Sequence, residues 1–170
     1  MDVLDAIKFK RAVRKFKDEP LPDDIMMAIL NAGRRAQSSK NTQPWHFIAI
    51  RNKETLAKMA QLGEWAGHLA GAAFAVAILT VDPAIRFSIM FDAGQAAAYM
   101  QLAAWSLGVG SCLATIYQPE EARKLLGFPE DLHLNIAISF GYPLDASVLT
   151  TPPIKGGRRS FIETVHWERW

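Results

Sequence analysis

Apolar residues recur at helical spacing in several stretches of the chain, and two of these stretches have a clear beginning. The first follows Pro22, opens with two acids and continues as IMMAILNAGRRA, as expected for a helix with acids in its first turn. The second follows Pro119 and opens with two acids in the same way. With two less regular patterns, these stretches predict helices at residues 2–9, 23–36, 53–62 and 120–126.

Continuous apolar runs between turn-forming residues predict the strands. The run AAFAVAILTV at residues 72–81 lies between Gly71 and Asp82, and it is typical of a buried central strand. Shorter runs of the same kind predict strands at residues 46–51, 111–117 and 133–140. Because these strands are interspersed with helices, the order predicts a mixed α+β domain whose central sheet is covered by helices.

One long stretch is almost free of charge. Residues 87–119 contain a single acid, Asp92, and no lysine or arginine. Their first part predicts a helix that is apolar nearly all round and stops at Gly108. A membrane span is excluded because Asp92, Gln95 and Gln101 make insertion costly. Two interpretations stay open: a helix in the core of one subunit, or a helix whose small residues pack against a second copy of the chain.

Composition narrows the class of protein. The chain has 170 residues, 50% of them hydrophobic, with 19 basic and 17 acidic side chains and one cysteine, Cys112. This length predicts a single domain, residues 1–170. Its last part, residues 150–170, combines turn formers with bulky aromatic residues and is expected to form an extended arm. Balanced charge argues against nucleic-acid binding, and one cysteine excludes disulfides and thiolate metal sites. The charged N-terminus lacks a secretory signal, so we expect a cytoplasmic protein without a membrane anchor.

Two basic clusters and one polar loop are the candidates for binding. Residues 8–17 hold six bases and no acid, and Arg158 and Arg159 form a second cluster near the other end of the chain. Such runs are usually solvated surface, but two anchored clusters would also suit a phosphate group. Residues 38–43 place hydroxyl and carboxamide groups in a turn, which suits the edge of a neutral heterocycle or simply a polar loop.

Catalytic motifs are missing from the sequence. It contains no GxSxG, no P-loop and no GxGxxG that opens a helix, and its histidines are scattered without metal-ligand spacing. We therefore expect no side-chain nucleophile, no metal and no catalytic residue in the ordinary sense.

Five segments resemble the FMN-dependent nitroreductase family, in the family's order and over nearly the whole chain. KRAVRKF is similar to its basic motif RRSxRxF, and SSKNTQPWHF to its loop (P)SxxNxQPWxF. FDAGQAAAYMQLAAWSLGVGSC resembles the family's long helix and the strand that follows. LLGFPEDLHLNIAISFGYP and GGRRSFIETVHWERW resemble its late strand and its C-terminal arm. One segment alone would be weak, whereas five in order are specific.

The resemblance implies a nitroreductase-like α+β fold, with a central mixed sheet flanked by helices, a long dimer-core helix and a C-terminal arm that embraces the partner subunit. It implies a homodimer with FMN at the interface, in which NADH or NADPH and then a nitroaromatic, a quinone or a similar small electrophile react in a ping-pong cycle. Alternatives are a flavin-binding or regulatory module, or a specialised dehalogenase, dehydrogenase or flavin-consuming enzyme. By position, the FMN-binding residues would be Lys10, Arg11, Ala12, Arg14, Arg35, Ser38, Ser39, Asn41, Leu113, Ala114, Thr115, Arg158 and Arg159.

Some positions depart from the family pattern. Ala12 stands where the family has serine and so offers no hydroxyl, and Lys10 replaces an arginine and offers only a point charge. Gln37 stands where the loop has proline. The chain is also short for the family, so we expect an open substrate pocket or one shaped by residues 63–68.

Overall fold

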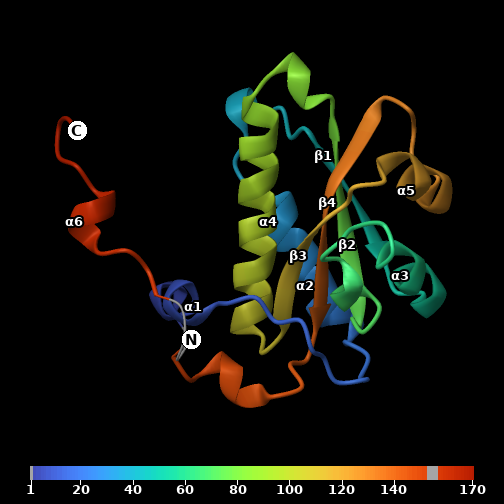
Figure 1. Ribbon diagram of the computed structural model, residues 1–170, viewed down its shortest axis with the longest axis horizontal. Helices are drawn as coiled ribbons and strands as arrows, with labels where there is room; N and C mark the ends of the chain where they lie inside the picture. The colour runs from blue at the N-terminus through green and yellow to red at the C-terminus, as the bar shows by residue number, and fades with distance from the viewer. Residues whose placement is uncertain (1, 153–156) are drawn as a thin grey trace.

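The computed structural model describes residues 2–152 and 157–170, and its centre is a four-stranded sheet in the order β1-β2-β4-β3 (Figure 1). Neighbouring strands pair antiparallel. A parallel bridge between Ala12 and Ser111 extends the sheet beyond β3 and makes it mixed. The α+β prediction is therefore confirmed, with strands β1 (Trp45–Ile50), β2 (Phe74–Val81), β3 (Gly110–Thr115) and β4 (Leu132–Gly141).

Helices cover both faces of the sheet (Figure 1). Successive side chains of β2 point to opposite faces of the sheet. Val76 and Ile78 pack in the hydrophobic cluster beside α2 and α4, whereas Ala77 and Leu79 pack in the cluster beside α3 and α5. The short helix α1 contacts α4 as well. The bounds are α1 (Val3–Phe9), α2 (Asp23–Arg34), α3 (Lys53–Met59), α4 (Ser88–Ser106), α5 (Pro119–Leu126) and α6 (Phe161–Thr164).

Helix α3 ends earlier than the sequence pattern predicts. The expected helix runs to residue 62, but α3 stops at Met59 because the next amides turn back more tightly. The N–H of Gln61 donates to Lys58 O and that of Leu62 donates to Met59 O, each three residues back along the chain. This turn directs the following residues toward the end of β3.

Helix α4 is buried on one side, which confirms the interpretation as a core helix, and exposed on the other, where packing against a second copy stays a prediction. Ala96, Met100 and Ala104 are fully buried in the core of this subunit. Phe87, just before the helix, and Phe91 on it are 91% and 74% exposed. Within the described ranges, no helix is both long and apolar enough to cross a membrane.

The C-terminal segment lies apart from the body of the subunit (Figure 1). All of residues 157–170 are exposed, among them Phe161, Trp167 and Trp170. Ser160 and Glu163 form a capping box that begins α6. Residues 153–156 of the expected arm lie outside the described residues, and the arm's role against a partner stays a prediction.

Candidate functional site

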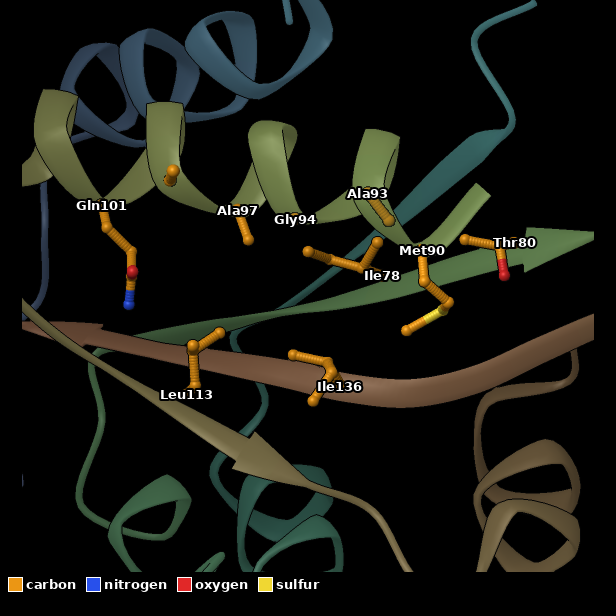
Figure 2. A pocket seen from close by; sticks show the side chains of 10 residues that line it. Ile78, Thr80, Met90, Ala93, Gly94, Ala97, Gln101, Leu113 and Ile136 are labelled. Carbon is orange, nitrogen blue, oxygen red and sulfur yellow. The ribbon is translucent and has the colours of Figure 1, made fainter. Parts of the chain in front are cut away.

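A cavity of about 260 Å³ lies between α4 and the sheet, close to β3. Figure 2 shows side chains from both layers directed toward this space, with Gln101 and Met90 from α4 and Leu113 and Ile136 from the strands. Its lining is mostly apolar. Leu113 is 46% exposed, so a flat apolar group could reach the side chain of this strand residue.

Lys10 joins the basic N-terminal segment to this cavity. Its Nζ donates to Oε1 of the buried Gln101 at 2.8 Å. Burial lowers the pKa of Lys10 below its ordinary value, Cys112 opposes this shift, and the positive charge of Arg158 adds to it. Arg158 comes from the other end of the chain, and although it is exposed, its positive charge acts on Lys10.

The segment that follows Lys10 is fixed along the free edge of β3. The N–H of Val13 donates to Ser111 O at 2.9 Å. Gly110 permits this approach, because a Cβ there would lie 2.7 Å from the Cβ of Val13. Arg14 is therefore placed by backbone contacts, although its own side chain is exposed.

Arg11 and Arg14 lie in a second, shallower hollow of about 250 Å³ beside Asp145 and Val148. Arg11 Nη1 donates to the carbonyl of Thr151 at 2.6 Å. Hydrogen bonds from Ser147 lower the pKa of Asp145, and Arg11 lowers it further. The hollow thus presents two guanidinium groups, which is the chemistry that binds a phosphate bidentately.

A buried polar cluster lies behind β3, and sequence patterns did not reveal it. Nδ1 of His68 lies 2.8 Å from Oγ of Ser139, which donates to Cys112 O at 3.3 Å. Burial lowers the pKa of His68, the nearby carbonyl of Leu113 raises it and Arg14 lowers it. Burial raises the pKa of the Cys112 thiol, so this thiol stays protonated at neutral pH. No sequence spacing links these residues, because three separate elements supply them.

The three strand residues expected to contact the flavin do not share a face. Leu113 faces the cavity beside α4, but the side chain of Ala114 is 1% exposed and packs in the core beside α3 and α5. Thr115 lies on the exposed side of the strand, as alternation requires. Ala114 could therefore reach a ligand in this cavity only through its backbone, and its contact with the flavin stays a prediction.

Residues after α3 pack tightly against the end of β3. Leu62 O accepts hydrogen bonds from the N–H groups of Tyr117 and Gln118 at 2.8 and 3.2 Å. A Cβ on Gly63 would lie 2.1 Å from Thr115 O, so only glycine fits. This contact places Trp65, 73% exposed, near this end of the strand, and the expectation that residues 63–68 shape the pocket stays a prediction.

The polar loop lies at the other end of α4. The N–H of Ser39 donates to both carboxylate oxygens of Asp92 at 3.2 Å, and Ser38 Oγ accepts from the N–H of Gln43 at 2.9 Å. Gln101, which binds Lys10, is nine positions further along the same helix, or about 14 Å along its axis. In Figure 1, the loop before β1 lies beside the N-terminal end of α4, whereas the segment that follows α1 passes the C-terminal part of the helix.

One subunit therefore assembles only part of the predicted set. Lys10 and Leu113 lie by Gln101 of α4, with Arg11, Ala12 and Arg14 on the segment along β3, and the charge of the exposed Arg158 acts on Lys10. The remaining predicted residues lie in the polar loop or, like the exposed Arg35 at the C-cap of α2, near it in sequence. Arg159 is exposed next to Arg158. The separated residues are Arg35, Ser38, Ser39 and Asn41.

Comparison with known proteins gives matches along the whole chain. A family model described as the Nitroreductase family matches residues 7–68 and 62–142. A Methanothermobacter thermautotrophicus protein with the provisional name NADH dehydrogenase/NAD(P)H nitroreductase is 31% identical over 179 residues, which cover 100% of this chain and 88% of the relative.

Solved structures also match nearly the whole length of this chain. An FMN-dependent nitroreductase from Clostridium difficile R20291 has a TM-score of 0.85 at 27% identity, covering 98% of this chain and 99% of that one. The NADPH:FMN oxidoreductase from Vibrio harveyi, complexed with NAD+, has a TM-score of 0.84 at 22% identity, covering 99% and 77%. At that identity the second match shows a shared fold alone.

Proposed function

The chain belongs to the nitroreductase family, and from this premise we propose that it is an FMN-dependent oxidoreductase. It uses NADH or NADPH to reduce nitroaromatics, quinones or similar small electrophiles in a ping-pong cycle. The observation that carries the proposal is the bond from Lys10, in the basic N-terminal segment, to Gln101, which lines the cavity together with Leu113. An anionic group and a flat apolar ring are the two parts of a flavin nucleotide.

The residues present fit FMN. Arg11 and Arg14 offer paired guanidinium donors in one hollow, and Arg158 adds positive charge near Lys10. Lys10 is held by Gln101, so its point charge has a defined position despite the missing arginine. Ala12 offers only its backbone, in line with its bridge to Ser111. In this proposal the arginines hold the phosphate and Lys10 faces the polar edge of the ring.

A second subunit would complete the site. The loop with Ser38, Ser39 and Asn41 is separated from Lys10 by about 14 Å along α4. Two copies whose α4 helices run antiparallel across a twofold axis would bring the loop of one copy to the basic cluster of the other. We therefore propose a homodimer with FMN at the interface, formed by single-domain subunits, residues 1–170, whose arm, residues 150–170, embraces the partner.

The chemistry needs little from the protein beyond binding and charge. Bound FMN would supply hydride transfer from the nicotinamide to the second substrate. Positive charge on Lys10 and Arg14 favours negative charge on a ligand beside them. The open edge near Trp65 gives a small electrophile access. No nucleophile is required, which agrees with the sequence; the cytoplasmic location stays a prediction.

The test is a flavin titration followed by anaerobic turnover. FMN added to the purified protein should bind with quenched fluorescence, NADH or NADPH should bleach the bound flavin, and a quinone or nitroaromatic should restore its colour. Bleaching by neither reductant would indicate a flavin-binding module, and recovery with neither oxidant would indicate a specialised enzyme. A protein that does not bind FMN would contradict the proposal.

A further inference from the structure

Asp92 is a buried acid in an otherwise uncharged helix. Asp92 is only 3% exposed, and both of its carboxylate oxygens accept a hydrogen bond from the N–H of Ser39 at 3.2 Å. Arg86 approaches from the segment before α4, with Nη2 3.6 Å from Oδ2 of Asp92. A buried carboxylate is costly unless it is paired and hydrogen-bonded, so its position in α4 calls for a reason beyond packing.

The contacts of Asp92 belong to a closed network around the polar loop. Arg86 Nη2 also donates to Oγ1 of Thr42 at 2.7 Å, and Thr42 Oγ1 donates to the carbonyl of Ser39 at 3.0 Å. The N–H and the carbonyl of Ser39 are therefore both fixed, one by Asp92 and one by Thr42. Arg86 joins the two ends of the network.

The loop needs such restraint because its backbone is strained. The backbone φ angles of Lys40, Asn41 and Gln43 are 52°, 54° and 46°. These values lie in the left-handed region, which residues other than glycine rarely adopt. Residues in that region persist only where the surroundings determine them, and they gather at functional sites. The network of Asp92, Arg86 and Thr42 supplies this restraint from outside the strained residues.

We propose that Asp92 and Arg86 are positioning residues that hold residues 38–43 in the conformation that binds the flavin. This inference rests on the proposed function, in which the side chain of Asn41 contacts FMN. Asp92 does not touch the ligand in this account. It acts through Ser39, by fixing the backbone from which Ser38, Ser39 and Asn41 project.

The first experiment measures FMN affinity by fluorescence quenching for Asp92→Asn and for the control Asp131→Asn, an exposed acid in the turn before β4. The amide keeps the volume of Asp92 but loses the charge that strengthens its bonds to Ser39 and Arg86. We expect FMN affinity to fall about tenfold or more in Asp92→Asn and to stay unchanged in the control. Unchanged affinity in both variants would overturn the inference.

A double-mutant cycle separates positioning from general stability. Asn41→Ala removes a proposed ligand, so the loss from Asp92→Asn should be clearly smaller in the Asn41→Ala background than in the wild type. A merely structural role for Asp92 would give additive losses, and additivity contradicts the inference. The thermal midpoint of each flavin-free variant shows whether the fold itself has changed.

A second variant keeps the test decisive if Asp92→Asn does not fold. Thr42→Val removes only the hydroxyl that links Arg86 to Ser39, on an exposed residue. FMN affinity should then fall about threefold or more, and an unchanged affinity overturns the inference. Failure of the wild-type protein to bind FMN is a different result, because it contradicts the proposed function and not the loop network alone.

Discussion

Gly63 offers a direct test of how the edge of the candidate site is built. In Gly63→Ala the new Cβ would lie 2.1 Å from Thr115 O, whereas real Cβ atoms essentially never approach closer than 3.0 Å. The two backbones must therefore separate by at least the difference, 3.0 − 2.1 = 0.9 Å. The obstacle is a backbone carbonyl in β3, so it cannot rotate away as a flexible side chain could.

This separation determines the size of the effect. The bonds from Tyr117 and Gln118 to Leu62 O measure 2.8 and 3.2 Å, and a further 0.9 Å along either would break it. Two lost hydrogen bonds cost about 2 kcal/mol, and the stiffer unfolded chain offsets about 0.4–1 kcal/mol. We expect the free energy of unfolding to fall by about 1–2 kcal/mol, which lowers the melting temperature by about 3–6 °C in a chain of this size.

Differential scanning calorimetry at a fixed protein concentration measures the effect, with Gly67→Ala as the matched control. Gly67 has open space around its Cβ position and no positive φ, so the same substitution four residues later should leave the midpoint unchanged or slightly raised. FMN affinity should fall only in Gly63→Ala, because Thr115 moves. Equal midpoints for the two variants would refute the close approach.

Three further predictions concern charge, pH and the arm. Arg14→Ala should weaken FMN binding at least about tenfold in a fluorescence titration, while Lys17→Ala should not. Because burial lowers the pKa of His68 below 6.5, the unfolded chain holds more protons as pH falls through that value, and the free energy of unfolding decreases. Urea titrations between about pH 7 and pH 5 should show this decrease in His46→Gln but not in His68→Gln. Deleting residues 150–170 should abolish both FMN binding and the dimer in sedimentation; a truncated dimer that binds FMN contradicts this.

Local patterns were enough to predict the elements of the fold. The run at residues 72–81 became β2, buried through Thr80, because a strand covered on both faces needs no polar alternation. The uncharged stretch became α4, and Gly108 follows its end with φ of 77°. The exact end of α3 was beyond such patterns, since contacts with β3 in three dimensions determine it.

The site was predictable only as separate groups. The two basic clusters were visible in the sequence, but the bond from Lys10 to Gln101 depends on how the N-terminal segment packs against α4. The face on which Ala114 lies depends on strand register, which composition does not specify. Asp92 was visible as the one acid of α4 and would have been assigned to capping or pairing. Its bond to Ser39 follows from the packing of the loop against α4.

The exposed apolar side chains include some on α4 and some on the arm, and their burial would fit the proposed dimer. Phe91 on α4 is 74% exposed, and Trp167 on the arm is 75% exposed, although each would gain roughly 2 kcal/mol from burial. Within one subunit, the arm lies apart from α4 (Figure 1). A second copy that covered α4 and received the arm would bury both surfaces and would carry its loop to Lys10 in the same step. In the proposed dimer, the same partner would therefore cover the apolar surfaces and complete the proposed flavin site.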